Sequence, residues 1–295
     1  MQDPLDYYTQ CKFKVIDVAS ITDCVVEGLK YPFNDIKKFL GFGVLFALLS
    51  ALSTGISLKS FDIFRNVTHM AENTNLTVSH LPVSQLPAGD IYFAVGLIIL
   101  SLIVSIFIMG YQYNIVKFSI DKKEDLPGFS DILGMFINGI KYFLVGIAYN
   151  IIPMIVLVAG IMLVGESSAL IAITFISVLL FIIAFFLQIM AINNMVAYDS
   201  IKKAFDLREI IDNIGNLGWG KYIGIILFTL IVFMIIMVAV NFILSLITVA
   251  FAATISNQAI IISFVISIIE GLFAESYGSL FFNRVCGSIY RESVK

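Results

Sequence analysis

Six apolar segments of about 20 residues or more dominate the sequence, and they restrict the chain to a small set of folds. A helix of about 20 apolar residues spans the roughly 30 Å hydrocarbon core of a bilayer. Only 13% of the residues are charged, about half the share found in soluble domains. This composition excludes a soluble enzyme, a disordered chain and a disulfide scaffold. We expect an all-α polytopic membrane protein with transmembrane helices at roughly Phe39–Leu58, Ile91–Tyr111, Tyr142–Val164, Ala169–Asn193, Tyr222–Phe251 and Ala259–Phe282.

The distribution of positive charge predicts the orientation of the chain. Of the 18 Lys and Arg residues, all except Lys59 and Arg65 fall in segments that share one side of the membrane. Because positive residues favour the cytoplasmic side, we expect a cell-membrane protein with both termini in the cytoplasm. Residues 1–23 are then a cytoplasmic N-terminal segment, and residues 24–290 form one six-helix transmembrane domain. No cleavable signal peptide is apparent, so the first membrane helix is expected to direct insertion.

The longest outer loop, expected at residues 59–90, contains two sequons for N-glycosylation, at Asn66 and Asn75. Modification there would agree with the predicted orientation, because both residues lie on the side opposite the termini. Such triplets also occur by chance in loops rich in Asn and Thr, so both interpretations stay open.

An internal repeat divides the chain into three parallel units, at about residues 24–120, 127–203 and 205–290. Each unit is predicted to contain an interfacial amphipathic helix followed by a two-helix hairpin, with a Lys and an aromatic residue at the membrane entry. The amphipathic helices either lie in the headgroup region or dock beneath the bundle. The entry lysines, expected to reach lipid phosphates, are Lys38, Lys141 and Lys221.

Glu270 is the strongest candidate for a functional residue, because it lies near the middle of the sixth apolar segment. A charged group at that depth costs about 2.5–3.5 kcal/mol, so ionisable residues there are functional candidates. On an α-helix Glu275 lies about 140° around the axis from Glu270, so the two do not suggest a paired site. Two interpretations stay open: a structural hydrogen bond from Glu270 to Asn241, Asn150 or Tyr149, or a proton or ion site.

Small residues and a proline in the apolar segments bear on helix packing. Gly43, Ala47, Ala51 and Gly55 recur every four residues in the first segment, a spacing that lets helices approach closely. Packing within the molecule is favoured there over a dimer interface. Pro153, inside the third segment, is expected to kink that helix.

No enzyme motif is recognisable in the sequence, and we expect neither catalysis nor a cofactor. Cys11, Cys24 and Cys286 lack the short paired spacing of zinc or redox motifs. His69 and His80 have no marked third ligand, so no metal site is expected. The net charge of −3 is too small and too mixed for a nucleic-acid surface. Membrane lipid is the expected partner, with a second copy or another membrane protein as further candidates.

Several short motifs resemble those of an uncharacterised, mostly archaeal membrane family, domain of unknown function 4013. The order and spacing of the motifs agree from about residue 24 to 290, and the long outer loop looks like an addition to the family pattern. The resemblance implies a multi-span membrane protein of archaeal type and implies no activity. The motifs are Gly28–Asp35, Gly110–Tyr111, Leu126–Phe129, Asn138–Lys141 and Leu217–Tyr222.

Taken together, the sequence predicts a non-enzymatic protein of the archaeal cell membrane with a structural, lipid-associated or partner-binding role. The alternative is a small transporter or proton-coupled permease that uses Glu270, with Asn241 and Asn150 along its path. A weaker third reading, a lipid-modifying enzyme, would need more carboxylates at the inner membrane rim than Glu275.

Overall fold

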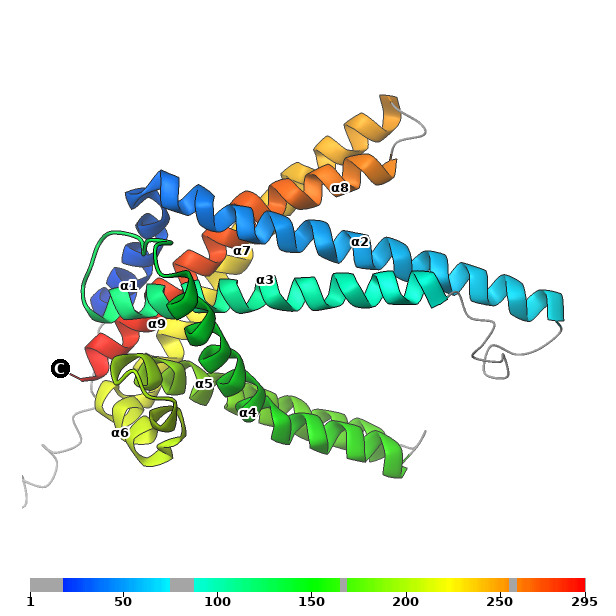
Figure 1. Cartoon of the computed structure of the whole chain (residues 1–295). Helices are drawn as coiled ribbons and strands as arrows, with labels where there is room; N and C mark the ends of the chain where they lie inside the picture. The colour runs from blue at the N-terminus through cyan, green and yellow to red at the C-terminus, as the bar shows by residue number, and fades with distance from the viewer. Residues whose placement is uncertain (1–17, 75–87, 165–168, 255–258, 295) are drawn as a thin grey trace, which may run out of the picture.

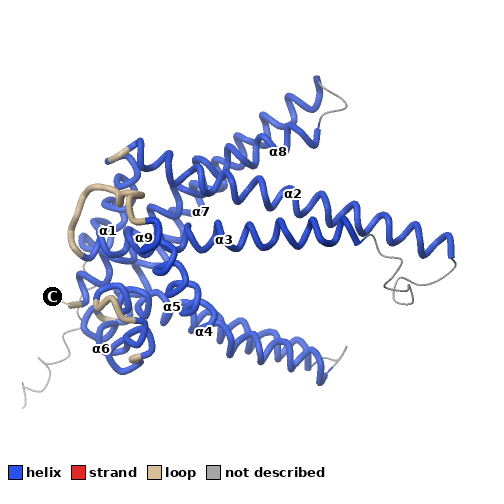
Figure 2. Tube along the Cα trace, viewed as in Figure 1, coloured by secondary structure: helices blue, strands red, loops and turns tan. Residues whose placement is uncertain are grey.

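The computed structural model describes residues 18–74, 88–164, 169–254 and 259–294, and within these ranges the chain is helical with short connections and no strand (Figure 1, Figure 2). Six of the described helices are long and apolar enough to cross a membrane. The predicted all-α fold with six membrane helices is therefore confirmed. These helices are α2 (Ile36–Thr74), α3 (Ala88–Ile120), α4 (Ile132–Val164), α5 (Ala169–Ala197), α7 (Trp219–Thr254) and the continuous run from α8 (Ala259–Ile269) into α9 (Ser276–Ser293).

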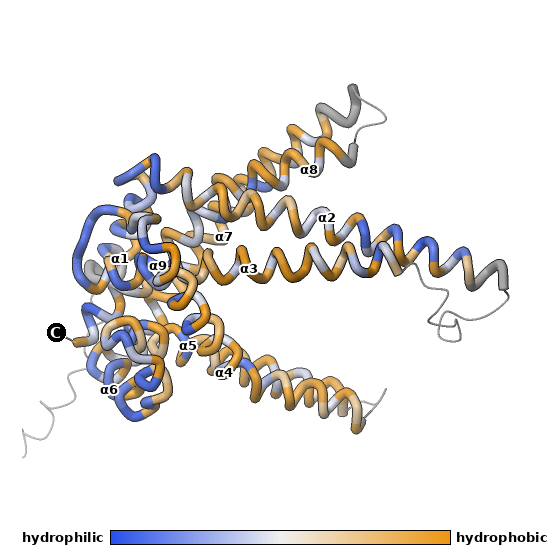
Figure 3. Tube along the Cα trace, in the orientation of Figure 1, coloured by the Kyte–Doolittle hydropathy of each residue, from blue (hydrophilic) through white to orange (hydrophobic). Residues whose placement is uncertain are grey.

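The long helices associate as three pairs that spread apart from a common body (Figure 1). In the view of Figure 1, the pairs α2–α3, α4–α5 and α7–α8 point in three directions away from the body. The body contains the inner ends of the long helices together with α1 (Val18–Lys30), α6 (Leu207–Leu217) and α9. Figure 3 shows that hydrophobic residues line the spreading pairs, whereas hydrophilic residues gather in the body and on the outer half of α2.

The main hydrophobic core lies in this body, on the side of the membrane that holds α1 and α6. Side chains of α1, α3, α5, α6, α7 and α9 meet there and are almost completely buried. Burial of apolar surface away from water contributes about 25 cal/mol of stabilising free energy per Å². Helix surfaces that are already surrounded by lipid do not gain this free energy when they pack together. The core includes Val25, Tyr113, Met190, Met195, Ile210, Ile214, Tyr222, Ile225, Phe281 and Ile289.

Helix α6 shows how the sequence sets a short helix of this body. The side chain of Asp206 accepts a hydrogen bond from the backbone N–H of Glu209 and caps the first turn. Gly218, with a φ of 92°, ends the helix where a residue with a Cβ would be strained. Between these ends Ile210 and Ile214 are buried against the body.

Helices α3 and α4 cross at two glycines. A Cβ added at Gly110 would overlap the carbonyl oxygen of Met135, and one at Gly139 would overlap the carbonyl oxygen of Ile106. The two backbones therefore touch directly, an approach that only small residues permit. The tight crossing joins the first helix pair to the second.

Several helices extend further than the sequence predicts. Helix α2 continues to Thr74 through the first half of the expected outer loop 59–90, because no Gly or Pro interrupts residues 56–74. The second expected interfacial helix is not a separate element, since the residues from Ile132 onward form the first turns of α4. Residues 283–293, beyond the expected end of the sixth membrane helix at Phe282, continue α9 into the core.

Two of the entry lysines bind the protein instead of reaching lipid phosphates. The Lys38 ammonium donates to the carbonyl of Leu126 at 2.8 Å and pairs with Asp35 at 3.2 Å. The Lys141 ammonium pairs with Asp199 at 3.0 Å. Both lysines therefore fasten connecting segments to the ends of membrane helices.

Candidate functional site

A π-helical segment, η6 (Glu270–Glu275), interrupts the sixth membrane helix and places both of its glutamates on one pocket. Its i→i+5 hydrogen bonds widen the turn, so residues five apart come closer around the axis than they do on an α-helix. The expectation that Glu270 and Glu275 lie on different sides was wrong, because it assumed α-helical geometry throughout. π-bulges of this kind are frequent at functional sites.

Helix α2 forms the opposite wall of this pocket. A Cβ at Gly271 would collide with Ser50 and the carbonyl oxygen of Phe46, so η6 lies directly against α2. Gly43 makes a similar contact, because a Cβ there would overlap the carbonyl oxygen of Leu272. Of the four small residues spaced four apart in this helix, the first, Gly43, therefore packs against η6, whereas the last, Gly55, faces Leu97 of α3.

The pocket has a volume of about 230 Å³ and holds a cluster of hydroxyl and carboxyl groups. The Ser50 hydroxyl donates to a carboxyl oxygen of Glu275 at 3.5 Å, and the hydroxyls of Thr54 and Ser267 are 3.1 Å apart. Oxygen atoms of this kind suit a proton, a water molecule or a hard cation. The pocket-lining residues are Leu49, Ser50, Ser53, Thr54, Ser267, Glu270 and Glu275.

The amides expected to partner Glu270 lie elsewhere. Asn241 is exposed on α7 and donates to the carbonyl of Met237 in its own helix at 2.9 Å. Asn150 donates to the side-chain oxygen of Gln188 at 2.8 Å, which joins α4 to α5. The structure therefore groups Glu270 with Glu275 and with hydroxyls of α2, and it does not bring Asn241 or Asn150 to this site.

A second polar cluster, which the sequence did not predict, lies in the body where α1 meets α9. Glu27 pairs with Arg284 at 2.6 Å and with Arg291 at 2.7 Å. The side chain of Arg284 is only 4% exposed; it also donates to the carbonyl of Lys123 and lies 4.5 Å from the ring centre of Tyr31. Burial alone raises the pKa of Glu27, but the hydrogen bond to Arg291 and the two positive charges outweigh it and lower the pKa.

The sequence contains only an ambiguous sign of this cluster. Arg284 and Arg291 fit an ordinary positive tail, and only their spacing of seven residues, two helical turns, hints at one buried helix face. The cluster borders a polar cavity of about 500 Å³. Because both guanidinium groups are already bound by Glu27 and by backbone carbonyls, we assign the cluster to the joining of helices.

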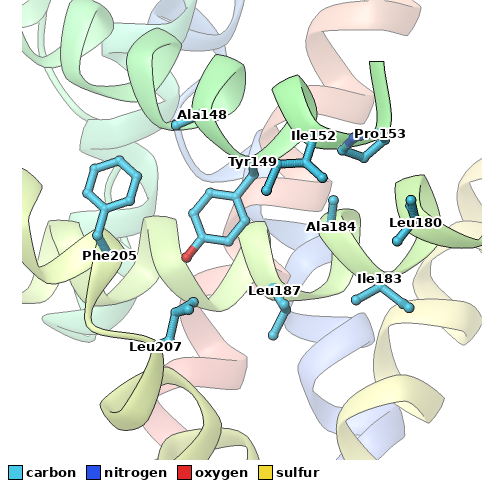
Figure 4. A pocket seen from close by; sticks show the side chains of 10 residues that line it. All are labelled: Ala148, Tyr149, Ile152, Pro153, Leu180, Ile183, Ala184, Leu187, Phe205 and Leu207. Carbon is cyan, nitrogen blue, oxygen red and sulfur yellow. The ribbon is translucent and has the colours of Figure 1, made fainter. Parts of the chain in front are cut away.

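A third feature is an apolar groove of about 330 Å³ on the α4–α5 pair (Figure 4). Its one polar side chain, Tyr149, donates its hydroxyl to the carbonyl of Ala204 at 2.6 Å and stacks beside Phe205. Figure 4 shows Phe205, Tyr149 and Leu207 at one end of the groove and Pro153 and Leu180 at the other. The full lining is Ala148, Tyr149, Ile152, Pro153, Leu180, Ile183, Ala184, Leu187, Phe205 and Leu207.

The remaining predicted residues are placed as follows. Asn66 is half-buried within α2 and not in a loop, and the hydroxyl of Thr68 in its sequon donates to the carbonyls of Phe64 and Arg65. Asn75 lies outside the described residues. Ala47 and Ala51 are half-buried in α2. Across the described ranges, no group of three His, Cys, Asp or Glu side chains is arranged to hold a metal ion.

Comparison with known proteins finds a family model that matches the chain. The family model described as "Protein of unknown function (DUF4013)" matches residues 93–245, slightly more than half of the chain and most of the region from α3 to α7. The predicted resemblance to this family is confirmed. No curated protein and no solved structure matches the chain.

Proposed function

The chain belongs to the DUF4013 family of proteins of unknown function, and on this premise we propose that it is a non-enzymatic, lipid-associated protein of the archaeal cell membrane. Both termini lie in the cytoplasm, as the positive charges favour. Lipid molecules occupy the spaces between the three helix pairs and complete the packing that the protein does not provide. The main observation that supports this role is the spreading of the pairs away from the body (Figure 1).

Exposure of the membrane helices supports the same role. In the most apolar stretch of each span only 11% to 22% of residues are buried inside the molecule. Large apolar side chains are exposed along all three pairs, among them Ile152 on α4, Phe175 on α5 and Ile235 on α7. Such surfaces would be unfavourable in water and are satisfied by hydrocarbon. The absence of enzyme motifs from the sequence agrees with a role in binding lipid.

Lipid retention tests this proposal. Protein purified in a mild detergent is expected to keep several phospholipids per chain in native mass spectrometry, and stripping them is expected to lower the melting temperature. Protein that keeps no phospholipid and melts at an unchanged temperature after stripping would contradict the proposal. In liposomes the protein is expected to move neither protons nor solutes.

A second candidate function is a proton-coupled permease, favoured by the pocket that holds Glu270 and Glu275. Two carboxyl groups among hydroxyls inside a membrane suit proton exchange. If the protein in pH-sensitive-dye liposomes dissipates a proton gradient, Glu270→Gln is expected to lower the rate at least tenfold. The matched control is Gln188→Glu, which adds a carboxyl at membrane depth outside the pocket and is expected to leave the wild-type rate unchanged. An unchanged rate in Glu270→Gln would exclude this candidate.

A further inference from the structure

The apolar groove on the α4–α5 pair lies at the depth of lipid chains. Its residues on α4 and α5 belong to candidate membrane spans. Leu187 lies ten residues before the end of α5 at Ala197, or about 15 Å along the helix axis. Ile152 and Ile183 border the groove and are 63% and 55% exposed. The groove therefore opens sideways toward hydrocarbon, within the leaflet next to the body.

Small side chains in the middle of the interface between α4 and α5 leave this groove unfilled by the protein. Ala148 and Ala184 occupy positions where larger residues would close the gap between α4 and α5. Beyond the groove, farther from the body, α4 and α5 pack tightly, because a Cβ at Gly160 would overlap the side chain of Ile173. A volume of about 330 Å³ falls within the range of known ligand pockets, and the lining offers only hydrocarbon and aromatic surface. Such a site suits part of one extended hydrocarbon chain.

Positive charge gathers at the end of the groove nearest the body. Phe205 and Leu207 line that end, and Lys202 and Arg208 lie close to them in sequence. Lys203 is bound by both Asp206 and Glu209. Lys202 and Arg208 are exposed and form no ion pair with any part of the chain that the structure describes.

Exposed Lys and Arg at a membrane surface attract anionic headgroups by about 1 kcal/mol each, and the planar guanidinium of Arg matches a phosphate. Asp212 lies one turn from Arg208 on the same face of α6 and forms no ion pair with it. Asp206 and Glu209 are both occupied by Lys203, so the charges of Lys202 and Arg208 stay available to an anion.

We propose that this groove binds one chain of an anionic phospholipid from the leaflet next to the body, with the phosphate held by Lys202 and Arg208. The proposal rests on the lipid-associated function above and adds a defined site and a headgroup class. Tyr149 and Phe205 form the aromatic end at headgroup depth, where such rings are favoured, and the chain extends from there toward Pro153.

Lipid competition in nanodiscs tests the site. The protein is incorporated in equal parts of phosphatidylglycerol and phosphatidylcholine, released into detergent, and its retained lipids are counted by native mass spectrometry. Ala148→Trp, which fills the groove, is expected to lower retained phosphatidylglycerol by about one molecule per chain, because the groove accommodates a single lipid. Ala239→Trp is the matched control, because Ala239 also lies on a membrane helix but is exposed on α7, outside the groove. Its retention should equal that of the wild type.

Charge removal tests the headgroup contact separately. Lys202→Gln and Arg208→Gln are each expected to lower the preference for phosphatidylglycerol over phosphatidylcholine about fivefold. Lys117→Gln, which removes an exposed charge on α3 away from the groove, should leave the preference unchanged. An unchanged preference in the double variant of Lys202 and Arg208 would overturn the assignment of the phosphate to these residues.

A fluorescence measurement keeps the proposal falsifiable if Ala148→Trp fails to fold. The chain has one tryptophan, so Phe205→Trp in a Trp219→Phe background reports on the groove alone. Brominated phosphatidylglycerol is expected to quench it at mole fractions well below those needed for brominated phosphatidylcholine. Equal, non-saturating quenching by both lipids would overturn the site.

The outcomes separate this proposal from the proposed function. If the wild type retains no phospholipid, the lipid-associated function fails. If it retains lipid and Ala148→Trp retains the same amount and kind, only the groove assignment fails. If Ala148→Trp instead converts a dimer to a monomer, the groove is a contact between two copies, and the lipid assignment is overturned.

Discussion

Glu27 is one carboxylate that forms ion pairs with two arginines inside the body. It belongs to α1, whereas Arg284 and Arg291 belong to α9, so the pair of bridges joins two helices that are far apart in sequence. A buried guanidinium that loses its partner is strongly destabilising, because the charge stays away from water without compensation. Arg284, at 4% exposure, is in that position.

We predict that Glu27→Gln destabilises the protein by about 2 kcal/mol at neutral pH, somewhat below the range for fully buried pairs because Glu27 is partly exposed. The pKa of Glu27 lies below its ordinary value of 4.5 in the folded state. Its contribution is therefore complete above about pH 4.5 and is lost as the pH falls through the lower folded-state value. Thermal melts between pH 7 and pH 3 measure both effects.

The matched control for this experiment is Glu124→Gln. Glu124 borders the same polar cavity, but its side chain is exposed. Its melting temperature is expected to follow that of the wild type at every pH. A Glu27→Gln protein that loses as much stability on acidification as the wild type would show that Glu27 does not carry the pH dependence.

At the scale of helices, the close crossing of α3 and α4 gives a second prediction. Gly139→Ala puts a Cβ into the carbonyl oxygen of Ile106, which belongs to rigid backbone. We expect a loss of about 2 kcal/mol, typical of overpacking, seen as a lower melting temperature in detergent. Gly96→Ala on α3 is the control, because a Cβ there meets nothing within 4 Å. It should be neutral or gain up to about 1 kcal/mol from helix propensity. Equal losses in both variants would contradict a tight crossing.

The membrane helices could be predicted because hydrophobicity over about 20 residues decides them locally. Their ends could not, since polar residues such as Asp62 and Arg65 do not stop a helix that lacks Gly or Pro. For the same reason, the sequence did not predict that α9 continues to Ser293 as a buried helix. Helix pairing across the body depends on contacts between distant segments, which no local pattern reports.

The candidate site was only half predictable for the same reason. Depth alone singled out Glu270, because an acidic residue in an apolar segment is visible in any sequence. Its neighbours depend on the π-helical turn and on the packing of Gly271 against α2. One extra residue in a turn rotates the residues that follow it, so Glu275 lies on the pocket with Glu270. Asn241 and Asn150 lie on other helices, where they bond to Met237 and Gln188 and do not reach the pocket.

At the scale of the whole molecule, the divergence of the helix pairs predicts distances between their outer ends. Spin labels at Met162 and Ile171, on α4 and α5 of one pair, should give a short distance by pulsed electron resonance. Labels at Met162 and Ile261, on different pairs, should give a distance longer by at least about 10 Å, one helix diameter. All three side chains are exposed. Similar distances for the two pairs of labels would show that the helix pairs close together in the membrane.

The native thiols do not disturb this labelling. Cys24 and Cys286 are buried, and Cys11→Ser removes the third cysteine. Burial, together with the negative charges of Glu292 and Glu27, raises the pKa of Cys24 to about 11. Its thiolate, the reactive form, is therefore scarce at the neutral pH of labelling.

Helix α9 contacts α1, α2, α3, α5, α6 and α7, and it follows all of them in the chain. A ribosome releases these earlier helices first, at about 5–20 residues per second, so the membrane helices among them must enter the bilayer before their central neighbour is made. The body therefore assembles after insertion. The helix pairs enter the membrane one after another, and they pack together only when α9 has been made and contacts them. Premature termination before Ser276 would leave well-inserted but unassembled hairpins, the kind of species that membrane quality-control proteases remove.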